Sequence, residues 1–202
     1  NGLAWTSVGG ELLPIEAAVL QGTGKIELTG SLGDVMKESG KLAVSYARLV
    51  AGQFGIDPNF YKTKDLHIHA PEGAVPKDGP SAGVTMLTAV ISALSGIPVR
   101  SDVAMTGEIT LHGKVLPIGG LREKTMAAYK AGIRTVIVPK ANQPDITEVD
   151  PVVRDAITFV YAETMADVLS VALESVPADL AASTVYNQTE QGKQPGQMPV
   201  HS

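Results

Sequence analysis

The segment "SAGVTMLTAVISALSG", residues 81–96, constrains the fold more than any other part of the sequence. Val84, Leu87, Ile91 and Leu94 recur at helical spacing, and nearly every other position of the run is small or apolar. A helix that is apolar around its whole circumference needs other elements packed on every side. We therefore predict that residues 81–96 form a central, buried helix.

Strand-like and helix-like runs surround this segment. We predict a β-hairpin over residues 14–30, where "PIEAAVL" and "KIELTG" flank the turn "QGTGK". A helix should follow, with Leu42, Tyr46, Leu49 and Val50 on its inward stripe and an end near Gly52 or Gly55. "DLHIHA" alternates as a strand does, and two further strands should meet at His112-Gly113.

The C-terminal half repeats a strand-then-helix order. We predict a helix from Leu121 to a Gly132 C-cap, a doubly buried strand at "TVIVP", and a strand "AITFVYA" followed by the helix "ETMADVLSVALE". Mixed strands and helices indicate a single α+β domain of mixed sheets over residues 1–176. Residues 177–202 are rich in Gln, Pro, Gly and Ser, which predicts a flexible tail.

Charge and residue usage exclude several classes of protein. The net charge is −5, which disfavours binding to nucleic acid or to an anionic membrane. There is no Cys, so disulfides, thiolate nucleophiles and Cys-ligated zinc are excluded. No run is long enough to span a membrane and no signal peptide is evident, so we expect a cytoplasmic protein. The chain begins with Asn, from which we expect a mature chain or an excised domain.

Ser81 allows two interpretations. Serine is a favoured N-cap, and "GPSAG" introduces the apolar helix, so a purely structural role is the commoner one for such a residue. The same position also suits a nucleophile, because the N–H groups and positive dipole end of a helix stabilise a developing oxyanion. A nucleophilic serine needs a base, and the sequence offers two kinds.

Histidine is the usual base, and His67 and His69 share one face of a predicted strand. A Ser-His-Asp site of Ser81, His67 and Asp78 is therefore conceivable. Lys124 is the alternative, since it lies one turn into a predicted helix beside Leu121, Ala127 and Ala128. It could act only if apolar burial lowered its pKa by about 3 units.

Two other sites are disfavoured by spacing. "QGTGK" lacks the first Gly and the final hydroxyl residue of a phosphate-binding loop, because Val19 and Ile26 occupy those positions. His67 and His69 lack a third metal ligand at a readable spacing, with Glu72 and Asp78 the nearest candidates, so we expect no metal site.

The motifs "PKDGPSAGVTM" and "MTGEITLHGKVLPIGGLREK" resemble the proteolytic domain of the Lon family of ATP-dependent serine proteases. The resemblance runs from "NGLAWTSVGG" to about "VLSVALE", and Pro80 before the serine is similar to the soluble bacterial and organellar branch. It implies a Ser-Lys dyad, with Ser81 as nucleophile, Lys124 as general base, and Thr106 of "MTGEI" hydrogen-bonded to the lysine.

The resemblance also implies supporting residues. His67, His69 and Asp78 match positions around the cleft that shape the active loop or a subunit contact. Positions implied in the substrate groove or the subunit contact are Trp5, Gly9, Gly10, Glu16, Pro80 and Glu108.

The full-length family members hydrolyse ATP with magnesium through a separate module and form hexamers that degrade unfolded or degron-bearing proteins. This chain contains no Walker motif, so we expect no cofactor here. The competing hypothesis is a non-catalytic Lon-like domain for assembly or substrate contact, which should lack the serine or the lysine.

Overall fold

A five-stranded mixed sheet forms the frame of the fold. The computed structural model describes residues 1–71 and 75–178. The strand order is β10-β9-β6-β1-β2, with β10, β9, β6 and β1 parallel and β2 antiparallel to β1. These strands are β1 (Gly2–Thr6), β2 (Gly9–Leu13), β6 (Val103–Met105), β9 (Thr135–Pro139) and β10 (Thr158–Ala162). The predicted α+β class with mixed sheets is confirmed.

Both faces of this sheet are buried. Successive side chains of β6 and β9 point to opposite faces, and those on each face enter a different apolar cluster. Val103, Met105 and Ile137 join the larger apolar cluster, whereas Val136 and Val138 join the smaller one. The first face is covered by helices α3 (Gly83–Ser95) and α6 (Met165–Ala172), and α1 (Asp34–Val50) packs on α3. The second is covered by α4 (Leu121–Lys130), the 3-10 segment η3 (Lys140–Glu148) and α5 (Pro151–Ala156).

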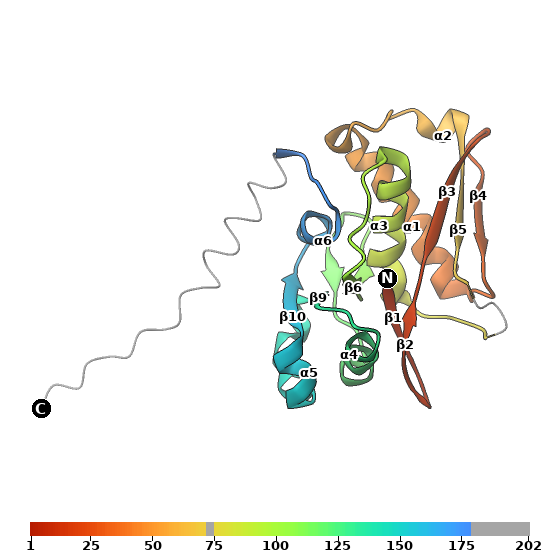
Figure 1. Cartoon of the computed structure of the whole chain (residues 1–202). Helices are drawn as coiled ribbons and strands as arrows, with labels where there is room; N and C mark the ends of the chain where they lie inside the picture. The colour runs from red at the N-terminus through yellow and green to blue at the C-terminus, as the bar shows by residue number, and fades with distance from the viewer. Residues whose placement is uncertain (72–74, 179–202) are drawn as a thin grey trace, which may run out of the picture.

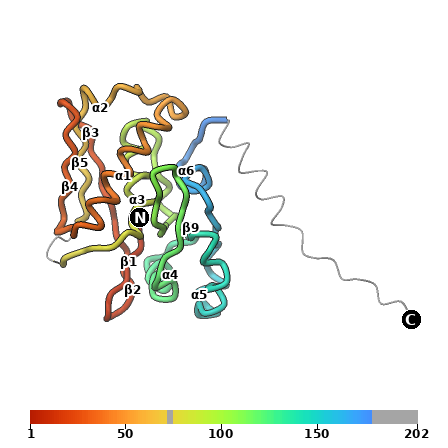
Figure 2. The backbone as a smooth tube through the Cα atoms, turned by 180° about the vertical axis from the view of Figure 1, so that it is seen from behind, coloured from red at the N-terminus to blue at the C-terminus, as the bar shows by residue number. Residues whose placement is uncertain are grey.

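Helix α3 is the central helix that the sequence predicts. Val84, Met86, Leu87 and Val90 are at most 1% exposed, and the helix contacts α1, α6 and strand β3. Figures 1 and 2 show α1 and α3 between a small sheet on one side and the β9–β10 edge of the large sheet on the other.

The small sheet corrects the hairpin predicted over residues 14–30. Strands β3 (Glu16–Gln21) and β4 (Ile26–Thr29) do not pair with each other, because β5 (Lys64–His69) lies between them. The carboxylate of Asp65 on β5 accepts hydrogen bonds from the backbone N–H groups of residues 23–25 at 2.8–3.0 Å. Strand β5 thus separates β3 from β4, and Asp65 binds the backbone of the connection that the sequence suggested was a tight turn.

The other predicted elements are present, with one stripe misassigned. Strands β7 (Glu108–Ile109) and β8 (Val115–Leu116) form the hairpin around His112-Gly113, and α4 ends two residues before Gly132. Helix α1 continues through η1 (Ala51–Phe54) to Gly55, but Leu49 is 65% exposed instead of packed inward. The remaining short helices are α2 (Phe60–Thr63) and η2 (Pro80–Ala82).

The predicted tail over 177–202 falls outside the described residues from position 179 onward, as does Glu72. Within the described ranges, none of the helices combines the length and apolar character needed to cross a bilayer.

Candidate active site

Ser81 lies in η2, directly before the first turn of α3. Its carbonyl oxygen accepts a hydrogen bond from the Gly107 N–H at 2.9 Å, and the Gly107 carbonyl accepts one from the Val84 N–H at 3.2 Å. These two bonds fix the Thr106-Gly107 segment against the start of α3. The sheet end that carries Thr106 is thereby brought beside the serine.

Lys124 completes the cluster from a third element, the first turn of α4. Its ε-amino group donates hydrogen bonds to Ser81 Oγ at 3.1 Å and to Thr106 Oγ1 at 3.0 Å. Lys124 and Thr106 are each 1% exposed, and no carboxylate of the described residues forms an ion pair with this lysine. The hydrogen-bond partners of the lysine amine are therefore two neutral hydroxyls, those of Ser81 and Thr106.

Burial without a counter-charge changes the acid-base behaviour of Lys124. Desolvation disfavours the ammonium form and lowers the lysine pKa from 10.5 to about 8. A substantial neutral fraction then exists at mildly alkaline pH. A neutral amine at 3.1 Å can accept the Ser81 hydroxyl proton, which gives this arrangement the chemistry of a nucleophile with its base.

Two glycines allow α4 to approach the sheet. Gly120 precedes the helix with φ of 70°, and a Cβ there would lie 2.3 Å from the Trp5 ring. A Cβ on Gly10 of β2 would lie 2.0 Å from the Glu123 carbonyl oxygen. Side chains at either position would push α4, and with it Lys124, away from Ser81.

A cavity of about 240 Å³ opens onto the Ser81–Lys124 pair. Strand β1 contributes Ala4 and Trp5 to its wall, and the serine-bearing segment contributes residues 78–81. The third side is residues 117–119, between β8 and α4. The structure thus gathers Trp5, Asp78 and Pro80 around the pair.

Asp78 holds the segment before Ser81 and is not hydrogen-bonded to Lys124. Its Oδ1 accepts hydrogen bonds from the backbone N–H groups of Met36 and Gly79, both at 2.9 Å. The Gly33 N–H also donates to the Lys77 carbonyl at 2.7 Å. The start of α1 therefore anchors residues 77–79, which is a loop-shaping arrangement for Asp78.

His67 and His69 lie elsewhere. His67 Nε2 and His69 Nδ1 are 2.8 and 2.7 Å from Thr29 Oγ1 on the small sheet, and neither histidine lines the Ser81 cavity. The described geometry therefore does not bring together the conceivable Ser81–His67–Asp78 site. Glu16 and Glu108 do not line this cavity either.

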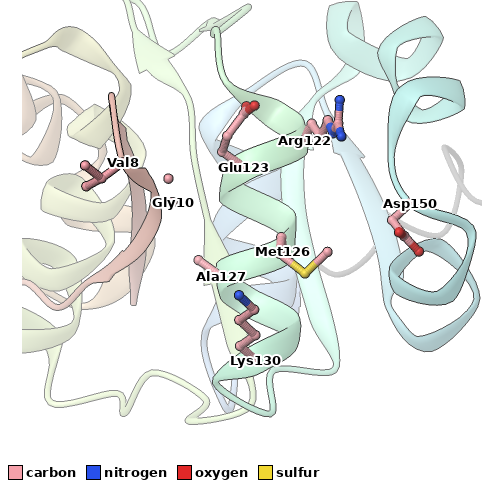
Figure 3. A pocket seen from close by; sticks show the side chains of 9 residues that line it. Val8, Gly10, Arg122, Glu123, Met126, Ala127, Lys130 and Asp150 are labelled. Atoms are coloured by element: carbon pink, nitrogen blue, oxygen red, sulfur yellow. The ribbon is translucent and has the colours of Figure 1, made fainter.

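Gly9 and Gly10 line a different cavity, of about 450 Å³, shown in Figure 3. Its other walls are the outward stripe of α4, Val8 at the β1–β2 turn, and Asp150. Lys124 belongs to the buried stripe of α4 and does not line this cavity, so this larger cavity does not contain the Ser81–Lys124 pair.

The sequence did not reveal Asn142, the residue that holds the third wall. Ile118 lines the Ser81 cavity, and its backbone is bound by the buried side chain of Asn142 from η3. "PKANQPD" has the composition of a turn, and nothing in its pattern points to the active site. In the described residues, no three His, Asp or Glu side chains converge in a way that could hold a metal ion.

The buried lysine should cost stability. Lowering its pKa from 10.5 to about 8 corresponds to a penalty of about 3 kcal/mol while the group is charged. Between these pH values the unfolded chain binds more protons than the folded one, so stability should rise with pH across this window. We expect Lys124→Met to raise the free energy of unfolding by up to about 3 kcal/mol at pH 7, less the lost hydrogen bonds, and this gain should fade by pH 10.5.

Urea unfolding at pH 7 and pH 10 would measure this difference. Lys130→Met is the matched control, because Lys130 is exposed on the same helix and should change stability little. A Lys124→Met variant that is less stable than the wild type at pH 7 would contradict the expectation.

Sequence comparison with known proteins places this chain in a family. The family model of the Lon protease C-terminal proteolytic domain matches residues 1–175. The chain is 57% identical to a Lon protease of Brevibacillus choshinensis over 177 residues, which are 88% of this chain and 23% of that protein. It is 59% identical to a Lon protease of Clostridium acetobutylicum over 173 residues, which are 86% of this chain and 22% of that protein.

The chain thus spans less than a quarter of the length of the curated relatives it matches. The match covers all three elements that carry Ser81, Thr106 and Lys124. The chain belongs to the family of Lon protease C-terminal proteolytic domains.

Proposed function

We propose that this chain hydrolyses peptide bonds as a serine endopeptidase, with Ser81 as nucleophile and Lys124 as general base. The observation that carries the proposal is the buried lysine amine, 3.1 Å from Ser81 Oγ and without an acidic partner among the described residues. A carboxylate in contact with the amine would favour the ammonium form and weaken the base.

The proposed reaction has two halves. Neutral Lys124 Nζ takes the Ser81 proton as Oγ attacks the substrate carbonyl carbon, and the carbonyl electron pair moves to its oxygen. The tetrahedral intermediate collapses, the C–N bond breaks, and the lysine ammonium returns the proton to the leaving amine. Water then attacks the acyl-enzyme with Lys124 again as base, releasing a carboxylic acid and restoring Ser81.

Thr106 supports this cycle by orientation. Its hydroxyl accepts from the lysine Nζ at 3.0 Å, and its backbone N–H is fixed by a bond to the Ile137 carbonyl at 3.1 Å. A neutral hydroxyl can direct the amine lone pair toward Ser81 without stabilising a positive charge. We place the developing oxyanion near the start of α3, where the positive end of the helix dipole favours negative charge.

The proposed substrate is an extended, unfolded polypeptide added as a strand at a sheet edge. β2 is an edge strand of the large sheet, next to the β1 residues Ala4 and Trp5 of the cavity. Main-chain pairing at such an edge holds many sequences with little side-chain preference. Gly9, Gly10 and Glu16 would then serve the groove or contacts between subunits.

The wider function is proposed from the family. In a full-length protein, an ATPase module with ATP and magnesium would unfold and deliver substrates to a homohexameric chamber in the cytoplasm. Its substrates would be misfolded or degron-bearing proteins, as part of protein quality control and the stress response. We propose no membrane, nucleic acid or cofactor contact for this domain.

Titration with a peptide boronic acid tests the proposal directly. A formed nucleophile and base should give saturable binding and a tetrahedral boron signal by boron NMR. His67→Gln should bind equally well, because His67 contacts Thr29 and lies outside the cavity. No tetrahedral adduct would favour a non-catalytic Lon-like domain, and loss of binding in His67→Gln would restore the histidine alternative.

A further inference from the structure

We propose that Asn142 is a positioning residue for peptide cleavage, because its carboxamide fixes the Ile118 backbone in the wall of the Ser81 cavity. This inference rests on the proposed function and names a further residue that serves it. Asn142 lies in η3, on a separate element from Ser81, Thr106 and Lys124.

The carboxamide of Asn142 binds both polar groups of one residue. Its Oδ1 accepts from the Ile118 N–H at 2.9 Å, and its Nδ2 donates to the Ile118 carbonyl at 2.9 Å. This is the pattern with which a neighbouring strand holds a residue. Asn142 is 3% exposed, and Nδ2 also donates to Asp145 Oδ2 at 2.7 Å, so both amide protons are used.

Residues 117–119, the segment that Asn142 holds, depend on Asn142 for their hydrogen bonds. Residues 117–119 follow β8 and precede Gly120 and α4, and all three line the Ser81 cavity. The two bonds with Asn142 are the hydrogen bonds that the described structure gives to this segment. The Asn142 side chain therefore makes the two hydrogen bonds to Ile118 that a neighbouring strand would otherwise make.

The same segment sets the entry into the lysine helix. Gly120 accepts from the Lys124 N–H at 2.9 Å, so a shift of residues 117–120 moves the first turn of α4 relative to Ser81. Displacement of a reacting group by about 1 Å can cost about 100-fold in rate. A loosened wall would also admit water to Lys124, whose low pKa depends on burial.

Three variants separate this role from a general structural one. Asn142→Ala removes both bonds to Ile118, whereas Asn142→Asp keeps the acceptor for the Ile118 N–H and loses the donor. Asn142→Asp with Asp145→Asn restores an amide–carboxylate pair inside η3 but still leaves the Ile118 carbonyl without its donor. Thr147→Val is the control, since it removes a side-chain bond to the Pro144 carbonyl in the same segment.

The experiment measures kcat and KM for a fluorogenic peptide against pH, the Lys124 pKa by carbon NMR of lysine Cε, and folding by circular dichroism. We expect Asn142→Ala to lower kcat about 10- to 100-fold with a smaller change in KM. Its Lys124 pKa should move upward toward 10.5. Asn142→Asp and the double variant should show the same direction, and Thr147→Val should match the wild type.

The outcomes distinguish this inference from the proposed function. A folded Asn142→Asp variant with wild-type kcat and an unmoved Lys124 pKa would overturn the positioning role while leaving the function intact. Rescue by the double variant would also overturn it, because only the bond within η3 would then matter. If the wild type itself cleaved no peptide, the proposed function would fail. The Lys124 titration in Asn142→Ala, which adds no charge, would still decide whether the wall protects the lysine.

Discussion

Replacement of Ser81 by Ala should reduce peptide hydrolysis by about 10⁴-fold or more, to the level that binding and oxyanion stabilisation alone provide. The Oγ atom is the one that would form the acyl-enzyme, and Lys124 would have no proton to accept in its absence. Folding should be retained, because Ser81 is anchored through its backbone carbonyl, which Ala also provides. Hydrolysis of a fluorogenic peptide at pH 8 to 9 measures the effect.

Ser45→Ala is the matched control for this variant. Ser45 is exposed on α1 and donates to the Lys41 carbonyl of its own helix at 3.0 Å, so its loss should leave hydrolysis unchanged. A peptide boronic acid should also lose its tetrahedral adduct with Ser81→Ala. Undiminished hydrolysis by Ser81→Ala would show that another group is the nucleophile.

Replacement of Lys124 by Met should lower hydrolysis by about 10²- to 10⁴-fold, the range that a general base contributes. In the wild type, activity should rise with pH and level off above the Lys124 pKa of about 8, because only the neutral amine can accept the serine proton. The variant should lose this rise. Lys124→Met is expected to be more stable than the wild type at pH 7, so unfolding would not explain its lost activity.

The pH profile of kcat/KM for both proteins checks this prediction. Lys130→Met keeps Lys124 intact and removes an exposed lysine of the same helix, so its profile should follow the wild type. A Lys124→Met variant that retained wild-type activity, or kept the rise near pH 8, would exclude the lysine as base.

The sequence predicted the elements whose pattern is local. The all-apolar run of α3, the β-branched run of β9 and the glycine-ended helix α4 each specify their own structure and burial. The pairing of β3 and β4 was predicted wrongly, because strand β5, far along the chain, separates them. Leu49 was placed inward by periodicity, whereas the actual inward stripe of α1 runs through Ala43, Val44 and Ala47.

For the candidate site too, the sequence predicted some features and only the tertiary structure decided others. The motifs around Ser81, Thr106 and Lys124 identified the chemical groups, because residue type and family resemblance are properties of the sequence. Their mutual distances, the burial of the lysine and the separation of His67 from the serine follow from packing between elements. Only tertiary structure could connect Asn142 to Ile118, since a hydrogen bond between η3 and the loop before α4 leaves no periodic pattern in either segment.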